Sequence, residues 1–167
     1  MTETIRYHPF PVQGIDAMTA VSARSYPRHT HDQYGIGTVD AGGHAWWSDR
    51  GRFEAGPGRL ICLNPGEVHD GWAIGERPRA WRMLYIEPSL MDSALADVGD
   101  GARADFTFGA GVFADPFVGR LLNRAYRYYS SPSSDVANEM ACEVVILKLV
   151  SRLRVHTTTA QRRGSQA

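Results

Sequence analysis

Glycine and proline divide the first 85 residues of this chain into short segments, and this punctuation limits the folds open to it. Glycine pairs or Pro-Gly steps stand at residues 42–43, 56–58 and 65–66. Short runs of β-favouring residues lie between them. Strands this short, with turns at nearly every step, are typical of an all-β barrel or sandwich. The predicted strands are residues 34–39, 44–47, 60–63, 68–74 and 80–86.

Two turns and one strand can be read in more detail. Residues 40–43 (DAGG) are typical of a hairpin turn, and residues 49–51 indicate another. In the last predicted strand, Trp81, Met83 and Tyr85 alternate with a second set of mostly apolar residues. We therefore expect this strand to be covered on both faces.

After residue 86 the pattern becomes helical. A short helix is predicted over residues 88–96, and a Gly- and Ala-rich irregular segment over 99–114. Asp115 followed by proline is typical of a helix N-cap, with the helix continuing to about residue 129. A final helix is predicted over residues 135–154.

The final helix has more apolar positions than one buried stripe requires, so it must be covered on more than one side. One explanation is packing on the sheet and on the neighbouring helix. The other is packing on the domain with one face and on a second copy of the chain with the other, which would make a homodimer. The residues predicted for that dimer interface are Met140, Val144, Leu147 and Val150.

Composition limits the function classes. A chain of 167 residues with 43% hydrophobic and 22% charged residues predicts one soluble domain with a substantial core. Its 18 basic and 18 acidic residues give a net charge of zero, which argues against nucleic-acid binding by this chain itself. No apolar run is long enough to span a membrane, and the N-terminus lacks the apolar core of a signal peptide, so we expect a cytoplasmic location.

Two histidine motifs carry the main functional signal. His29 and His31 are spaced so that both side chains project from the same face of a strand, and His69 follows a Pro-Gly turn further along. If His69 faces them from a neighbouring strand, three imidazoles converge inside the barrel. Such a cluster is either a site for a divalent transition metal (Zn, Ni, Mn or Fe) or the polar floor of an organic-ligand pocket. No catalytic residue is predicted.

Other residues are candidates for the wall of a ligand pocket. Gln33 has the same parity as His31, although it is a poor metal ligand. Trp72 and Trp81 fall in predicted strands near His69 and can supply apolar contacts. Arg24 flanks the first motif and can pair with an anionic or polyol ligand.

With both motifs and the helical tail considered together, the chain resembles the N-terminal sensor domain of AraC-type bacterial transcription regulators. The resemblance is carried by residues 27–34 (PRHTHDQY), 40–43 (DAGG) and 58–71 (GRLICLNPGEVHDG), and extends loosely to about residue 154. It implies a mainly β fold, a cupin-like (jelly-roll) barrel followed by a C-terminal pair of helices. It further implies a small effector bound inside the barrel, a dimer formed by the long final helix, and DNA binding only by a helix-turn-helix part that these residues lack.

The resemblance divides the chain into an N-terminal arm (1–14) that closes over the pocket, a barrel (15–87), a helical dimerisation region (88–154) and a linker or tail (155–167). It also has two departures. Enzymatic cupins carry a glutamate where this chain has Gly35 and an asparagine where it has Ala73. These departures favour a non-enzymatic effector-binding domain. The alternative is a small metal-dependent cupin enzyme, a dioxygenase or isomerase, that uses His29, His31 and His69.

Overall fold

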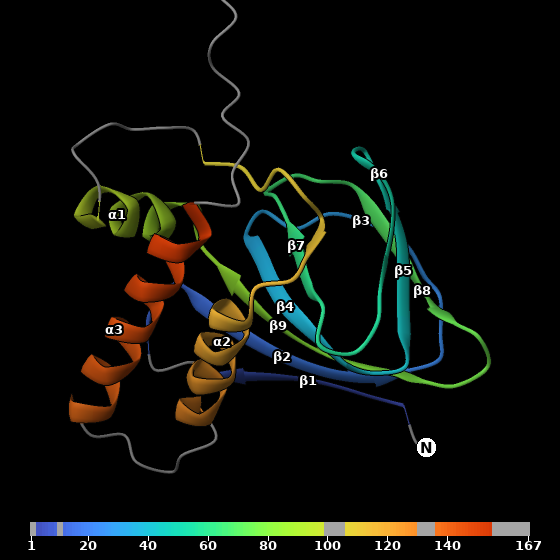
Figure 1. Cartoon of the computed structure of the whole chain (residues 1–167), viewed down its shortest axis with the longest axis horizontal. Helices are drawn as coiled ribbons and strands as arrows, with labels where there is room; N and C mark the ends of the chain where they lie inside the picture. Colours follow the sequence, from blue (N-terminus) through green and yellow to red (C-terminus); the bar gives the residue numbers. More distant parts are fainter. Residues whose placement is uncertain (1–2, 10–11, 99–105, 130–135, 155–167) are drawn as a thin grey trace, which may run out of the picture.

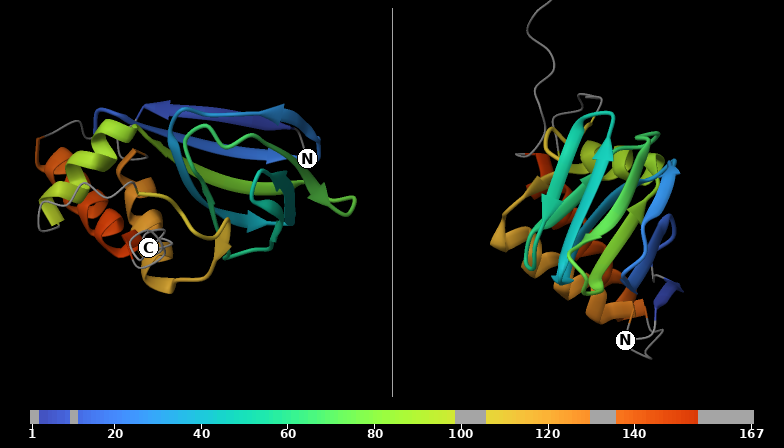
Figure 2. Two further views of the ribbon diagram at one scale, coloured as in Figure 1. Left: turned by 90° about the horizontal axis from the view of Figure 1, so that it is seen from above. Right: turned by 90° about the vertical axis from the view of Figure 1, so that its right-hand side faces the viewer.

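The computed structural model describes residues 3–9, 12–98, 106–129 and 136–154. Within them, two antiparallel β-sheets face each other as a barrel, and three helices gather at one side of it (Figure 1). The right-hand view of Figure 2 looks at the barrel from the side away from the helices, and there the smaller sheet lies in front of the helices. The prediction of a mainly β, cupin-like barrel followed by helices is confirmed.

The larger sheet contains the residues that were expected to form an arm, since residues 4–9 pair along their length with residues 16–21. Its strand at residues 79–86 is covered on both faces, as predicted. Trp81, Met83 and Tyr85 belong to the core between the sheets, whereas Leu84 and Ile86 belong to the core beneath the helices. In spatial order the strands are β1 (Thr4–Pro9), β2 (Ile15–Ser22), β9 (Arg79–Ile86), β4 (Tyr34–Ala41), β7 (Leu60–Leu63) and β10 (Val112–Phe113).

The smaller sheet is joined to the larger one by the predicted turn between β4 and the next strand, β5 (Gly43–Ser48). Gly42 has a φ of +69°, and a Cβ there would stand 2.8 Å from the carbonyl oxygen of Pro78, so this turn requires glycine. The spatial order of this sheet is β3 (Tyr26–His29), β8 (His69–Ile74), β5 (Gly43–Ser48) and β6 (Gly51–Ala55).

The helices are α1 (Pro88–Val98), α2 (Pro116–Tyr129) and α3 (Val136–Leu153), close to the predicted ranges. Asp115 is the N-cap of α2, because its Oδ1 accepts hydrogen bonds from the backbone N–H groups of Phe117 (2.9 Å) and Val118 (3.3 Å). Its other carboxylate oxygen pairs with Arg152 of α3 at 2.8 Å. One side chain thus caps α2 and links it to α3.

The packing of α3 corrects one predicted interface residue. Val150 is fully buried, together with Val145 and Leu149, against the chain's own core. It therefore belongs to the inner face of the helix and is not available to a second copy. Met140 is 60% exposed and Val144 48% exposed, and Leu147 is half-buried at the border of the core.

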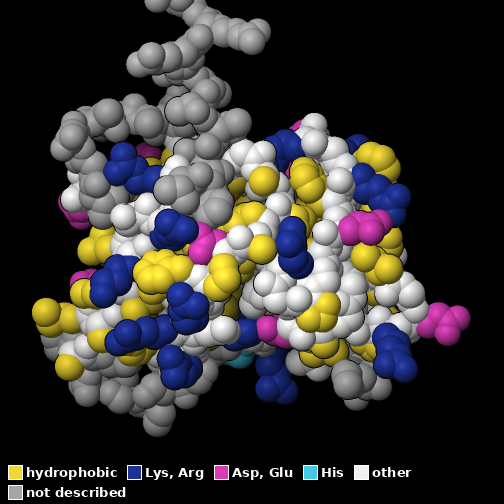
Figure 3. All heavy atoms as spheres, in the orientation of Figure 1, with side chains coloured by type: hydrophobic (Ala, Val, Ile, Leu, Met, Phe, Trp, Pro, Cys, Tyr) yellow, Lys and Arg dark blue, Asp and Glu magenta, His cyan; other side chains and the backbone are white. Residues whose placement is uncertain are grey.

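The surface of the helical side is rich in arginine. On α2, Arg120, Arg124 and Arg127 are exposed, and Figure 3 shows basic side chains gathered over this side of the molecule. None of the helices in the described residues is both long enough and apolar enough to cross a membrane.

Candidate functional site

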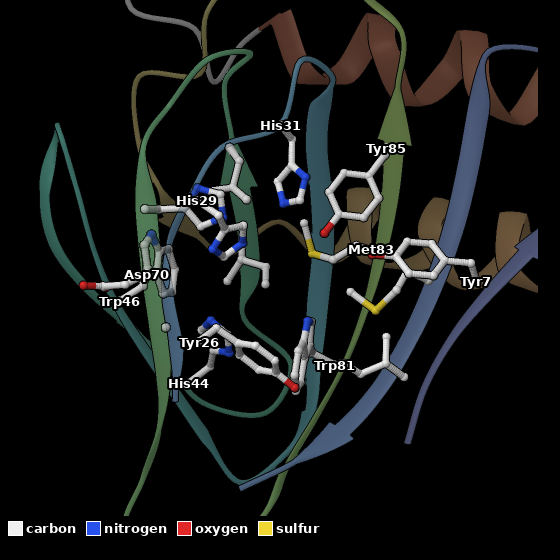
Figure 4. Close-up of a pocket in the computed structure, with 16 residues that line it drawn as sticks. Tyr7, Tyr26, His29, His31, His44, Trp46, Asp70, Trp81, Met83 and Tyr85 are labelled. Carbon is white, nitrogen blue, oxygen red and sulfur yellow. The ribbon is translucent and has the colours of Figure 1, made fainter. Parts of the chain in front are cut away.

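A cavity of about 130 Å³ lies between the two sheets (Figure 4). The larger sheet contributes mostly apolar side chains, and the smaller sheet contributes most of the polar ones. Two residues of β1, Ile5 and Tyr7, form part of the wall and remain 42% and 67% exposed, so this strand lies at the mouth. The full lining is Ile5, Tyr7, Met18, Tyr26, His29, His31, His44, Trp46, Ile61, Leu63, His69, Asp70, Gly71, Trp81, Met83 and Tyr85.

His29, His31 and His69 converge as the sequence predicted, with candidate ligand nitrogens all within 4.8 Å of one another. His29 and His69 stand opposite each other in the register of β3 and β8. His31 lies beyond the end of β3, where its backbone carbonyl accepts a 2.8 Å hydrogen bond from the N–H of Gly66. The Pro-Gly turn therefore holds both histidine segments together.

The first and last of these histidines are oriented by their own backbone. Nδ1 of His29 lies 2.7 Å from the carbonyl oxygen of Pro27, and Nδ1 of His69 lies 2.9 Å from that of Glu67. Because a carbonyl oxygen only accepts, each Nδ1 must carry the proton and donate. Each Nε2 is thereby left with its lone pair, which is the form that accepts a hydrogen bond or binds a metal ion.

Burial favours the neutral form of two of these histidines, His31 and His69. Desolvation, followed by the charges of His69 and His29, lowers the pKa of His31 to about 4. Desolvation also lowers the pKa of His69, although its hydrogen bond to the Glu67 carbonyl opposes that effect. At neutral pH the imidazoles of His31 and His69 therefore present lone pairs rather than positive charge.

Glu67, the acidic residue of the second motif, supports the turn and does not join the imidazoles. It is 6% exposed, its Oε2 accepts the backbone N–H of Asn64 at 3.0 Å, and the same oxygen pairs with Arg50 at 2.8 Å. The Asn64 side chain in turn accepts the backbone N–H of Phe108 at 2.8 Å. Much of the second motif is thus architectural.

The departure at Gly35 has a structural counterpart. A Cβ on Gly35 would meet Cε of Met83 at 3.1 Å and Cβ of Leu63 at 3.3 Å, and both residues line the cavity. The space of a longer side chain at this position is taken by the Met83 thioether. The cluster found in the described residues is therefore composed of three histidines without a carboxylate.

Of the other predicted pocket residues, Trp81 lines the cavity. Trp72 does not, because it lies on the outer side of β8 with the Arg52 guanidinium 6.0 Å from its ring. Gln33 lies outside the cavity as well, donating to Asp16 (3.0 Å) and Glu87 (2.9 Å).

Arg24 also lies away from the cavity. Its side chain is 77% exposed and pairs with Glu3 at 2.8 Å. Both Gln33 and Arg24 were expected at the pocket from their nearness to the histidines in sequence. The chain leaves β3 after His29 and leaves β2 after Ser22, and these changes of direction carry the two side chains elsewhere.

Sequence reasoning missed two polar residues at the other end of the cavity. His44 lines it from β5, and the buried Arg79 stands behind His44, with Nε donating to His44 Nδ1 at 2.8 Å. A signal for Arg79 was available, since it extends by one step the alternation of Trp81, Met83 and Tyr85 that points into the barrel.

Comparisons with known proteins bear on this arrangement. A stretch of 75 residues, 45% of this chain, is 27% identical to the HTH-type transcriptional regulator YbfI of Bacillus subtilis, and covers 27% of that protein's length. The chain thus spans about a quarter of the curated relative that it matches.

Solved structures of cupin domains are also similar over the barrel. A cupin 2 barrel protein of Salinispora arenicola (20% identity, TM-score 0.46) is matched over 55% of this chain and 81% of that one. The cupin domain of an XRE family transcriptional regulator of Enterobacter cloacae (14% identity, TM-score 0.46) is matched over 53% and 99%.

The family described as "AraC-like ligand binding domain" matches residues 16–146, which is more than half of the chain. The matched range contains both histidine segments and the strands β5 and β9 of the cavity wall, and it leaves out β1 and the last turns of α3. This chain belongs to the family of AraC-like ligand binding domains.

Proposed function

We propose that this chain is the ligand-sensing and dimerisation domain of an AraC-type bacterial transcription regulator. A small effector binds inside the barrel, and a separate helix-turn-helix domain of the regulator binds DNA. Membership of the AraC-like ligand binding family and the similarity to an HTH-type regulator support this function. The observation that carries it is the cavity itself, where aromatic and apolar walls meet inward-facing polar groups.

Ligand binding can reach the rest of the molecule through β1. Ile5 and Tyr7 face the cavity from an edge strand whose register partner is β2. A ligand that contacts these side chains favours the conformation in which β1 is paired. That differential contact is what a binding event needs in order to shift a conformational equilibrium.

The exposed face of α3 supports the dimer. Met140, Val144 and Leu147 follow one another at helical spacing, and the first two are exposed. An apolar stripe of this kind is suited to pairing with its copy. We assign the interface to these three residues and exclude Val150, which is buried in the chain's own core.

Sedimentation velocity tests the dimer. We expect wild type to sediment as a dimer and Val144→Glu as a folded monomer, because a charge in the stripe cannot be buried without a partner. Phe117→Glu is the matched control, since Phe117 is also an exposed apolar residue but lies on α2. A monomeric wild type at high micromolar concentration would contradict the dimer.

Ligand binding is tested by titrating small sugars, amino acids and organic acids while following tryptophan fluorescence, since Trp46 and Trp81 line the cavity. We expect at least one class to bind and to lose binding in Met83→Trp, which fills the cavity. Circular dichroism checks that the variant is folded. Binding that is equally strong in Met83→Trp would place the ligand outside the barrel.

A second candidate function, a metal-dependent cupin enzyme, is favoured by the convergence of His29, His31 and His69. Their donor set fits a divalent transition ion, which would supply Lewis-acid chemistry when bound. The side chains themselves supply lone pairs oriented by the backbone carbonyls of Pro27 and Glu67. Elemental analysis of protein purified without added metal decides: stoichiometric metal that is lost in His31→Ala favours the enzyme.

A further inference from the structure

Arg79 is fully buried and forms no salt bridge within 4.0 Å among the described residues. Its Nη1 donates to the backbone carbonyls of Arg24 (2.8 Å) and Ser22 (3.5 Å), and its Nη2 is buried with no hydrogen-bond partner. The carboxylate of Glu3 is occupied by the Ser22 hydroxyl and by Arg24. Burial lowers the pKa of Arg79, and the charges of Tyr26 and Glu3 only partly oppose that effect, so the buried charge remains costly.

Aromatic rings separate this charge from solvent. The guanidinium carbon lies 4.7 Å from the ring centre of Trp81 and 5.3 Å from that of Tyr26. Both rings line the cavity. The positive charge therefore stands directly behind the cavity wall, where the low dielectric lets it act on whatever occupies the cavity.

Arg79 also determines how His44 faces the cavity. Since the guanidinium Nε donates to Nδ1, that nitrogen must hold a lone pair, and the imidazole proton resides on Nε2. Nε2 lies 3.4 Å from the point where a Cβ on Gly71 would stand, beside the cavity. Burial and the charge of Arg79 lower the pKa of His44 to about 3, so the ring stays a neutral donor.

The ring of Trp46 lies beside His44, with ring centres 5.3 Å apart. It lies two residues after His44 on β5, so both side chains share the inner face, and its ring stacks on Phe53 with centres 5.3 Å apart. Its Nε1 is buried and has no hydrogen-bond partner. Asp70, the acidic residue in the lining, is directed away from the cavity (Figure 4), where it accepts the backbone N–H of Trp47 at 2.7 Å.

We propose that the His44 end of the cavity binds the carboxylate of a small ring-bearing organic acid, with His44 Nε2 as the donor and Arg79 as the charge behind it. This subsite is distinct from the three-histidine cluster, whose lone pairs repel an anion. A carboxylate there accepts a hydrogen bond from His44 and adds a negative charge near the buried guanidinium, whose Nη2 has no hydrogen-bond partner.

The apolar side of the cavity limits the rest of the ligand. Met18, Ile61 and Met83 line it, and its volume of about 130 Å³ is close to the ~150 Å³ at which apolar cavities bind benzene. A single six-membered ring bearing one carboxylate matches these dimensions. The inference deepens the proposed function by naming its effector class, and rests on it only for the regulatory consequence of binding.

The test compares benzoate with its neutral analogue benzamide, titrated into chelator-treated domain and followed by tryptophan fluorescence. We expect benzoate to bind at least about tenfold more tightly than benzamide, because a hydrogen-bonded charge adds to the contacts of the ring. His44→Leu should abolish that preference, and His44→Gln, which retains an N–H donor and an acceptor for Arg79, should restore part of it. His8→Leu is the control, since His8 is a histidine of β1 outside the cavity lining.

Equal affinity for the two probes, or no benzoate binding at millimolar concentration, would overturn the subsite. So would benzoate binding that appears only after a divalent metal is added, because the carboxylate would then sit at the three histidines. The wild-type comparison stands even if His44→Leu fails to fold. Benzoate binding that leaves the amide hydrogen exchange of β1 unchanged would count against the sensing function and leave the subsite intact.

Discussion

The two ends of the cavity use the same side chain in opposite forms. At one end, His29 and His69 donate from Nδ1 to backbone carbonyls and present Nε2 lone pairs. At the other end, His44 accepts at Nδ1 from Arg79 and presents an Nε2 proton. The difference shows that the partner behind an imidazole, rather than the imidazole itself, decides whether a pocket wall accepts or donates.

The largest effect is expected from removing the group that sets the donor end. We expect Arg79→Met to lower the free energy of unfolding by about 3 kcal/mol, because the carbonyls of Ser22 and Arg24 lose their buried donor. Urea denaturation measures this change. Arg52→Met is the control, since Arg52 is 52% exposed and should change stability by less than about 0.5 kcal/mol. A small loss for Arg79→Met would mean that the buried cation is not integral to the fold.

The acceptor end should be separable from the donor end by added zinc. We expect His69→Ala to lower Zn²⁺ affinity at least about 100-fold, since losing a ligand costs more than losing the group that orients it. His44→Ala should leave the affinity unchanged, because its Nε2 carries a proton. Competition with a chromogenic chelator measures both values. Equal losses in the two variants would show that the ends are not independent.

The sequence predicted the acceptor end better than the donor end, for a physical reason. Two local features predicted the acceptor end, the spacing of His29 and His31 and the Pro-Gly turn before His69. Features that depend only on neighbouring residues can be recognised from the sequence. The tautomer of His44 depends on Arg79, which comes from a strand in the other sheet. Likewise, periodicity revealed two apolar stripes on α3 but not which of them faces the core, so Val150 was assigned to the wrong one.

Acid should weaken the fold through both ends. Burial lowers the pKa of His31 to about 4 and of His44 to about 3, whereas both titrate near 6.5 when unfolded. Below about pH 6.5 the unfolded chain binds protons that the folded chain does not, so stability is complete above that pH and falls as pH decreases. Each histidine contributes up to about 1.4 kcal/mol per pH unit.

Urea denaturation from about pH 7 down to about pH 4 measures this slope. His44→Gln should reduce this slope by about one proton below about pH 5.5, where the unfolded histidine is protonated and the folded one, with a pKa of about 3, is not. His31→Gln should reduce the slope mainly between about pH 6.5 and about pH 4, the unfolded and folded pKa values of His31. A slope that neither variant alters would mean that other groups dominate the acid response.

The smallest effect is expected from a single methyl group at the donor end. A Cβ at Gly71 would stand 3.4 Å from Nε2 of His44 and 3.8 Å from the carbonyl oxygen of Ala45, which are ordinary contacts, so Gly71→Ala should fold normally. The methyl partly covers the His44 donor and should weaken benzoate binding about threefold, a fraction of one hydrogen bond. Zinc affinity should not change, because the methyl contacts the donor end alone. Gly56→Ala is the control, since a Cβ there meets nothing within 4 Å. If the methyl weakened zinc and spared benzoate, the assignment of the two ends would have to be exchanged.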